Sequence, residues 1–430
     1  MQNNKVTLTK IVGGGQSLGT LESGKKAFIW GGLPGETVEF QVTKKKSSMV
    51  EGIATEIISA SKDRIAPIDP DSYLSTSPWQ IASFDAEALY KKQLINDAFT
   101  LHNVTLPHET TIYSDGIKFH YRNKVEFSWW GDEDENGKET LDLAFFRRGG
   151  KGKIPVQGTS LAIEDINILA RHIRDHLHAA GITARDLKTV LIRSDQAGHC
   201  VWQLYVKNED TAHSIARLDY SKLPALGGEI IYSDPRSPAS KITKRIHKYG
   251  EIVLSDTILS VPFNYATEGF FQVNIPVYEH ALQDMKKWIP VGRPVVDMYS
   301  GVGTIGLTIG GDQATLVEVD EHAVREMNRN IAELGISAVA VLSASEHALN
   351  LIDGDATIVL DPPRAGLHPD VITKLLEAKP TRIVYLSCNP VTQARDVAGL
   401  LEKYTIINHQ GYNFFPRTPH IEHLVVLELV

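Results

Sequence analysis

The chain has 430 residues, 42% of them hydrophobic and 22% charged, so it is long enough for several domains and too apolar to be disordered throughout. Its 44 Lys and Arg and 52 Asp and Glu give a net charge of −8, which excludes a globally basic nucleic-acid binder. Only two cysteines occur, Cys200 and Cys388, so a disulfide framework or a four-cysteine metal site cannot be built. The chain lacks an apolar run that could span a bilayer, and its first residues lack the core of a secretion signal. We therefore expect a cytoplasmic protein without a membrane partner.

Residues 1–66 predict a small closed barrel of the OB type, because five short β-type runs are separated by glycine-rich turns. This segment carries nine Lys and Arg and six Asp and Glu, a net charge of +3 within an acidic chain. The run Lys44–Lys46 lies in it. A lysine triplet alone is usually a solvated loop, but a small barrel with a basic rim is typical of single-stranded nucleic-acid binding.

Residues 67–270 predict an α+β central domain. Helices are expected near 85–102 and 163–180, and β-type runs at 119–130, 141–148, 190–194, 200–206 and 229–233. Cys200 lies within one of these strands and is expected to be a buried core residue.

Residues 271–430 predict a mostly parallel, doubly wound α/β sheet, because strand-like runs alternate with helical stretches. The expected strands are 294–299, 314–319, 338–342, 356–360, 382–387, 404–412 and 422–430. The last two are joined by a loop too short for a crossover helix, so they must pair antiparallel. Seven strands ending in an antiparallel hairpin are the layout of class I methyltransferases, whereas a plain Rossmann dinucleotide fold would have six parallel strands.

The first βα turn of this sheet contains Gly301 and Gly303, which let the backbone approach a bound nucleotide at a helix N-terminus. Glu318, at the end of the next strand, is placed to accept hydrogen bonds from ribose hydroxyls. Dinucleotide enzymes share this pattern, so a nucleotide-dependent oxidoreductase stays an alternative at this point.

Two further strand ends favour thiol chemistry. Asp361 follows the fourth strand and Cys388 the fifth, so both face the crevice at the carboxyl edge of the sheet. Asn389 is expected to cap the following helix, which would place the Cys388 sulfur at its positive end and lower the pKa of the thiol. Glu422, before the last strand, is the candidate base.

The chain resembles the RNA uridine-5-methyltransferase family over nearly its whole length. The matching motifs, in family order and spacing, are Phe270–Asn274, the Gly301/Gly303 loop, Asp361–Gly366, Ser387–Pro390 and His420–Glu422. The N-terminal barrel resembles the RNA-binding TRAM domain of the ribosomal-RNA branch, and Tyr121–Lys124 resembles a signature of the central domain.

This resemblance implies S-adenosylmethionine as the methyl donor and a uridine in folded RNA as the acceptor. The implied cofactor-binding residues are Gln272, Tyr299, Gly301, Gly303, Thr304, Glu318, Ser345 and Asp361. The implied substrate-binding residues are Phe270, Arg122, Lys124 and Arg364. Thr304 and Ser345 stand where the family more often has other residues. By the same resemblance the Cys388 thiolate adds to carbon 6 of uracil, and Glu422 removes the proton from carbon 5.

One departure from the family concerns an iron–sulfur cluster that many TRAM-bearing members hold. The corresponding stretches, 74–81 and the region of Ser160, contain no cysteine, so we expect no cluster. Trp79 and its neighbours are expected to fill that space.

The resemblance leaves the RNA open. The barrel favours 23S ribosomal RNA, and the T-loop uridine of tRNA is the alternative substrate. Cytosine-5 RNA methylation is a rival of the same class, and a non-catalytic RNA-binding protein is a rival of a different class. We expect a monomer built from three domains, 1–66, 67–270 and 271–430.

Overall fold

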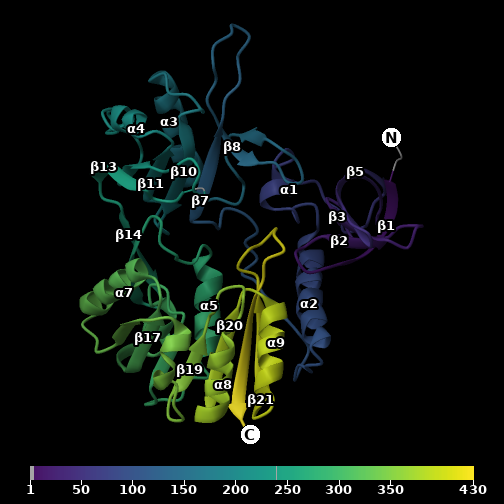
Figure 1. Ribbon diagram of the computed structural model, residues 1–430, viewed down its shortest axis with the longest axis vertical. Helices are drawn as coiled ribbons and strands as arrows, with labels where there is room; N and C mark the ends of the chain where they lie inside the picture. Colours follow the sequence, from purple (N-terminus) through teal and green to yellow (C-terminus); the bar gives the residue numbers. More distant parts are fainter. Residues whose placement is uncertain (1–3, 239) are drawn as a thin grey trace. The chain divides into compact units, whose positions relative to one another are not determined.

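The computed structural model describes residues 4–238 and 240–430, and its chain forms two compact units (Figure 1). The first unit comprises Met1–Phe84, Ile117–Leu254 and Ala266–Glu268. The second comprises Asp85–Gly116, Ser255–Tyr265 and Gly269–Val430. Among the described residues, no helix is both long and apolar enough to cross a membrane.

The N-terminal strands of the first unit close into a five-stranded barrel, as the sequence predicts, and the strand order is β1-β2-β3-β5-β4. The strands are β1 (Asn4–Ile11), β2 (Ser17–Thr20), β3 (Lys26–Trp30), β4 (Thr37–Lys45) and β5 (Met49–Ser59). Alternate side chains, such as Val6, Leu8 and Val38, fill the interior. Lys44–Lys46 lie exposed at the turn between β4 and β5.

The rest of the first unit is built on a seven-stranded sheet in the order β13-β12-β11-β10-β7-β8-β9. Its strands are β7 (Lys124–Trp130), β8 (Asp142–Phe146), β9 (Lys153–Val156), β10 (Leu187–Ser194), β11 (Cys200–Val206), β12 (Gly227–Tyr232) and β13 (Lys244–Gly250). Helices α3 (Glu164–Ala179) and α4 (Glu209–Ile215) pack on one face through a continuous apolar core. Cys200 is buried in that core, as expected, and burial raises the pKa of its thiol to about 12.

The segment that precedes this sheet is held by hydrogen bonds around Gln80. Its amide nitrogen donates to Asp69 Oδ2 at 3.0 Å and to Ser77 Oγ at 2.7 Å, and Ser160 Oγ donates to Asp69 Oδ2 at 2.7 Å. Trp79 is buried, and its indole nitrogen donates to the barrel carbonyl of Gly15 at 3.0 Å. Packing of Trp79 and the hydrogen bonds around Gln80 therefore hold this segment. Helix α1 (Tyr73–Thr76) lies in the same segment.

The second unit contains an eight-stranded sheet in the order β18-β17-β16-β19-β20-β22-β21-β6. Its strands are β16 (Val295–Met298), β17 (Ala314–Glu318), β18 (Val339–Leu342), β19 (Thr357–Leu360), β20 (Arg382–Ser387), β21 (Tyr404–Tyr412), β22 (Glu422–Leu429) and β6 (Ile112–Tyr113). The first five of these pair parallel, and β22 pairs antiparallel with both β20 and β21, as expected.

The expected count of seven strands is wrong for this sheet. The eighth strand, β6, comes from a distant part of the chain and pairs parallel with β21 through Gly411↔Ile112 and Tyr412↔Tyr113. A two-residue strand carries no periodicity that a sequence could reveal.

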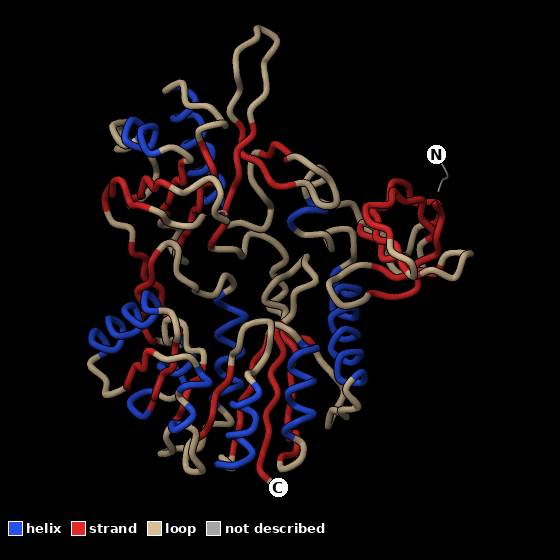
Figure 2. The backbone as a smooth tube through the Cα atoms, in the orientation of Figure 1, coloured by secondary structure: helices blue, strands red, loops and turns tan. Residues whose placement is uncertain are grey.

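Helices cover both faces of this sheet (Figures 1 and 2). On one face α2 (Phe84–Leu101), α8 (Pro369–Ala378) and α9 (Pro390–Leu400) share a single apolar core with the strands. On the other, α6 (Thr304–Ile309) contacts β16 and β17 and packs beside α5 (Ile275–Lys286). Helix α7 (Glu321–Leu334) contacts β17 and β18. The hairpin β14 (Val253–Ile258) and β15 (Val261–Ala266) completes the described strands.

Candidate active site

The turn after β16 adopts backbone conformations that require glycine. Gly301 and Gly303 have φ of +56° and +88°, and Gly303 precedes the first turn of α6. A Cβ at Gly301 would meet no atom within 4 Å, whereas one at Gly303 would lie 3.0 Å from Leu307. The predicted glycine turn is therefore formed at the start of α6, with open space over Gly301.

Glu318 fixes this loop from the end of β17. Its Oε2 accepts a hydrogen bond from the Gly301 backbone N–H at 2.9 Å, and its Oε1 accepts from the Val319 and Asp320 N–H groups, both at 2.8 Å. The carboxylate is thus oriented beside the glycine loop, although part of its hydrogen-bonding capacity is used by the protein backbone.

Three carboxyl groups interact electrostatically at the carboxyl edge of the sheet. Burial raises the pKa of Asp361 to about 7 and that of Asp297 to about 8, and the Asp361 charge adds to the effect on Asp297. Burial, with Asp361 nearby, holds the pKa of Glu422 well above its ordinary value. Asp297 Oδ2 accepts from the Gly306 backbone N–H at 2.9 Å. The shared environment disfavours ionising all three groups together.

Cys388 lies at the end of β20, and Glu422 lies at the start of β22. Ser387 pairs with His423 across the two strands, so the next positions, Cys388 and Glu422, lie at the same end. The thiol is half-buried. Asn389 caps α9 as expected, accepting from the Val391 N–H at 3.2 Å.

The expectation of a lowered thiol pKa is wrong. Burial, and then the carboxyl groups of Glu422 and Asp361, raise the pKa of Cys388 to about 11. Only Arg364 opposes this, through its charge and a hydrogen bond to the thiol. The helix-end argument fails because desolvation and two neighbouring acids outweigh a partial positive charge.

Other predicted cofactor residues have distinct surroundings. The Thr304 hydroxyl lies 2.8 Å from that of Tyr278, and Ser345 Oγ donates to Glu346 at 3.2 Å. Tyr299 and Ser345 line a cavity of about 600 Å³ together with the loop after β19. Gln272 is buried.

The predicted substrate residues fall into both units. Phe270 is 69% exposed, whereas its neighbour Phe271 stacks on Tyr265 with 3.9 Å between ring centroids. Arg364 is exposed and lies 3.3 Å from His420 Nδ1. An exposed aromatic ring and an exposed guanidinium are available for a flat base and a phosphate.

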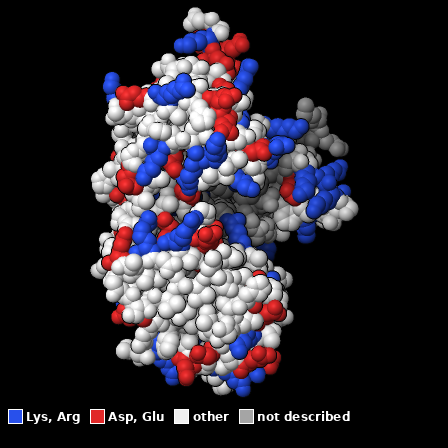
Figure 3. Space-filling model, turned by 60° about the vertical axis from the view of Figure 1, so that its left-hand side comes forward, with Lys and Arg blue, Asp and Glu red and all other residues white. Residues whose placement is uncertain are grey.

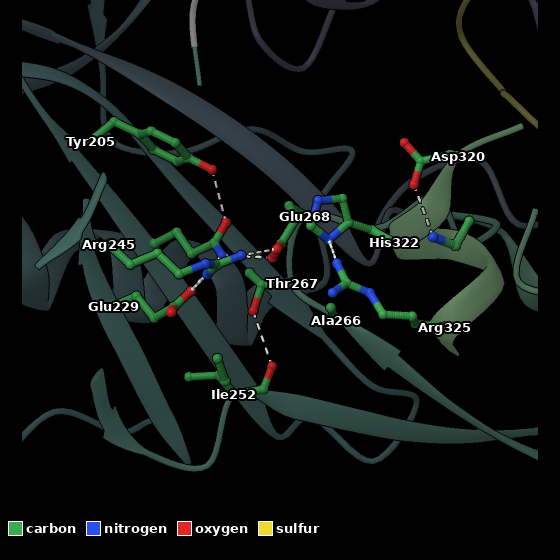
Figure 4. A network of polar contacts seen from close by, with 12 residues as sticks. Tyr205, Glu229, Arg245, Ile252, Ala266, Thr267, Glu268, Asp320, His322 and Arg325 are labelled. Carbon is green, nitrogen blue, oxygen red and sulfur yellow. Dashed lines mark hydrogen bonds and ion pairs between the residues drawn. The ribbon is translucent and has the colours of Figure 1, made fainter. Parts of the chain in front are cut away.

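Arg122 and Lys124 belong to the first unit, where Lys124 is part of a buried polar system. Lys124 Nζ donates to the Glu268 carbonyl at 2.9 Å, and burial lowers the pKa of its amine to about 7. Arg245 pairs with Glu229 and Glu268 in the same system (Figure 4). Lys124 thus holds the backbone shortly before Phe270. The Arg122 side chain is half-buried, and its backbone bridges to the segment before α3.

The model of the tRNA (uracil-5-)-methyltransferase family matches residues 87–430. Curated relatives include an uncharacterized RNA methyltransferase of Nitratidesulfovibrio vulgaris, 27% identical over 98% of this chain and 95% of that protein. Another, from Enterococcus faecalis, is 27% identical over 93% of this chain and 92% of that protein. The chain belongs to the tRNA (uracil-5-)-methyltransferase family.

A solved structure shares the fold of this family member over nearly its full length. It is the Pyrococcus abyssi tRNA (uracil-54, C5)-methyltransferase in complex with S-adenosyl-L-homocysteine, with a TM-score of 0.78 and 19% identity. The match covers 98% of this chain and 100% of that one. This similarity concerns the fold, while the family model over residues 87–430 makes the chain an RNA (uracil-5-)-methyltransferase by family.

Two further groups of the candidate site were not predicted from the sequence, Asp297 and Tyr278. Asp297 is fully buried at the end of β16, where a sequence reading sees only a strand residue. Tyr278 is buried on α5, and burial together with the charges of Asp361, Asp297 and Glu422 raises the pKa of its phenol well above the ordinary value. The one sequence signal was a polar residue in an apolar strand, Asp297 within Val295–Met298.

Proposed function

We propose that this protein methylates carbon 5 of a uridine in RNA, with Cys388 as the nucleophile and Glu422 as the base. The observation that carries the proposal is the grouping of a half-buried thiol, Glu422, Asp361 and Arg364 at one edge of the sheet. These groups suit a reaction in which a thiol adds to a base and a proton is removed later.

The residues fit S-adenosylmethionine as the cofactor. Asp361, Asp297 and Glu422 all resist ionisation where they lie, so the site is complementary to a ligand that carries positive charge. The open space over Gly301 accepts close approach of a ligand to the loop. When bound, the cofactor supplies an electrophilic methyl group on a sulfonium centre. Gln272, Tyr299, Thr304, Glu318 and Ser345 are the other residues we assign to holding it.

The protein side of the mechanism has two steps. The half-buried Cys388 thiol releases its proton to solvent, and its sulfur bonds to carbon 6 of uracil. The electron pair of the carbon 5–carbon 6 double bond then moves onto carbon 5 and the carbon 4 carbonyl, which makes carbon 5 nucleophilic. After methylation, Glu422 in its carboxylate form takes the proton from carbon 5. The electrons of that carbon–hydrogen bond re-form the carbon 5–carbon 6 double bond, and the carbon–sulfur bond breaks to release the thiolate. Arg364 favours the thiolate, because its positive charge and hydrogen bond lower the pKa of Cys388 against the effect of burial.

Phe270, Arg364, Arg122 and Lys124 are the residues we assign to the RNA. Phe270 is exposed and can stack on a uracil that has left the RNA helix. A base must leave its stack in this way before an enzyme can react with its ring. Lys124 also positions the backbone before Phe270 through Glu268.

For the acceptor we keep 23S ribosomal RNA, because the barrel resembles the RNA-binding domain of that branch. The T-loop uridine of tRNA is a second candidate, favoured by the similarity of fold to the Pyrococcus abyssi tRNA enzyme. We also propose the domain boundaries 1–66, 67–270 and 271–430, a monomer, cytoplasmic location and no iron–sulfur cluster.

The test is a methylation assay with labelled S-adenosylmethionine on purified 23S ribosomal RNA and on tRNA, followed by nucleoside analysis. We expect 5-methyluridine in one of the two RNAs, and no product with Cys388→Ala, because the nucleophile is lost. Cys200→Ala is the matched control and should keep activity if it folds. Product formation by Cys388→Ala, or 5-methylcytidine as the product, would refute the proposal.

A further inference from the structure

A buried ionic cluster lies in the second unit, between α2 and the loop that joins β21 to β22. It consists of Glu87 and Lys91 on α2 and of Asn413 and Arg417 on the loop, and we call it the α2 clamp. Their exposed fractions are 0%, 0%, 1% and 2%. Burying charged groups costs free energy unless the protein supplies hydrogen-bond partners for them. The complete burial of these four side chains therefore needs an explanation.

The side chains of the α2 clamp form hydrogen bonds both with backbone groups of the β21–β22 loop and with its side chains. Glu87 accepts from the Arg417 backbone N–H at 3.1 and 3.0 Å and from Asn413 Nδ2 at 2.9 Å. Lys91 Nζ lies 3.2 Å from Glu87 Oε1 and donates to the Phe415 carbonyl at 3.1 Å and to Asn413 Oδ1. Arg417 has a φ of +67°, a left-handed conformation that a non-glycine residue keeps only when its surroundings impose it.

The clamped loop leads directly to the candidate base. Tyr412, just before the loop, pairs with Glu422, just after it. Between them the clamp fixes Asn413, Phe415 and Arg417. On the other side, Asn274 Nδ2 donates to the Phe414 carbonyl at 3.2 Å, which links the loop to the segment after Gln272.

We propose that Glu87 and Lys91 are positioning residues that hold the β21–β22 loop so that Glu422 is aimed at the reacting base. The proposal rests on the proposed function, because it takes Glu422 as the base. Stability alone does not explain the clamp, since apolar residues of similar size commonly replace buried ion pairs without loss of stability. A carboxylate and an amine aimed at backbone N–H and C=O groups specify one loop conformation, which apolar packing would not.

The test compares Lys91→Met with Lys92→Met in the full-length protein. Lys92 is the next residue of the same helix and pairs with Glu109 instead, so it controls for a charge lost from α2. With RNA and S-adenosylmethionine, we expect Lys91→Met to lower kcat by about tenfold or more, because small misplacements of a reacting group are costly. The KM for the cofactor should not change. A methylated protein–RNA adduct should accumulate, because proton removal by Glu422 slows.

Hydrogen exchange measures the loop without reference to catalysis. We expect the Arg417 amide to exchange at least tenfold faster in Lys91→Met than in Lys92→Met, while the amides of β20 remain protected. Should Lys91→Met fail to fold, the double variant Glu87→Gln/Lys91→Met removes both charges and is measured in the same way.

Two results would overturn the proposal: unchanged Arg417 exchange, or a loss of kcat without adduct accumulation. A wild-type protein that forms no 5-methyluridine would overturn the proposed function instead. The two failures are therefore distinguishable.

Discussion

At the residue scale, the ionisation behaviour of the site depends on the number of carboxyl groups that lie in it. Asp361 and Asp297 have pKa values raised to about 7 and about 8, chiefly by burial, and burial also holds the pKa of Glu422 well above its ordinary value. A nearby cation stabilises the ionised form of each carboxyl group, whereas a second ionised carboxylate destabilises it. Two of these acids, Glu422 and Asp361, also raise the pKa of Cys388, so a positively charged ligand would make both the carboxylates and the thiolate easier to form.

This predicts pH-dependent cofactor binding. Between pH 6 and 8 the carboxyl of Asp361 changes from mostly protonated to mostly ionised, so the affinity for S-adenosylmethionine should rise with pH and protons should be released on binding. For each proton released on binding, the Kd for S-adenosylmethionine can fall by at most about tenfold per pH unit. Calorimetric titration in buffers of different ionisation enthalpy would count those protons.

Asp361→Asn is the control for this titration. The α-amino group of the ligand titrates in the same range, and its contribution remains in the variant. The part that disappears in Asp361→Asn belongs to Asp361. Identical pH profiles for wild type and Asp361→Asn would contradict the assignment.

At the element scale, the loop between β16 and α6 combines two glycines with different constraints. Gly301 and Gly303 both have positive φ, but only Gly303 would bring a Cβ against Leu307 at 3.0 Å and Met327 at 3.1 Å. Backbone strain applies to both positions, whereas a packing conflict applies to one.

Alanine at each position separates the two effects. Gly301→Ala should lower the free energy of unfolding by about 1 kcal/mol, through the cost of the left-handed conformation. It should also weaken cofactor binding, because its methyl group enters the open space over the loop. Gly303→Ala should cost about 2–4 kcal/mol, since a packing conflict adds to the strain. Urea unfolding measures both, and a Gly303→Ala protein as stable as Gly301→Ala would contradict this account.

Most elements of the fold could be predicted from the sequence, because alternation and turn residues are local signals. The five-stranded barrel was expected within residues 1–66, and helices α2 and α3 and the antiparallel β21–β22 pair were expected at nearly the observed residues. The packing position of α2 could not be predicted, because its residues Ile95 and Phe99 pack on the sheet of the second unit, which is distant in the sequence. The pKa of Cys388 was mispredicted for the same reason, since the burial and the acids around the thiol follow from tertiary structure.

At the scale of the whole molecule, the charge distribution constrains how RNA can bind. In the view of Figure 3, Lys and Arg side chains are interspersed with Asp and Glu over the upper part, whereas a broad area of the lower part carries no charged side chains. The chain is acidic overall, at −8, while residues 1–66 carry a net +3. Affinity for RNA must therefore come from local basic groups such as Lys44–Lys46, not from an overall field.

The central claim, covalent catalysis by Cys388, is tested most directly by trapping the protein on RNA that contains 5-fluorouridine. In 5-fluorouridine, carbon 5 carries a fluorine in place of the proton that Glu422 would remove. Elimination therefore cannot follow, and the carbon–sulfur bond should persist. With S-adenosylmethionine present, we predict a stable complex whose digested peptide carries a methylated fluorouridine on Cys388. The absence of a complex with an RNA that is otherwise methylated, or a nucleotide attached to Cys200, would contradict the account.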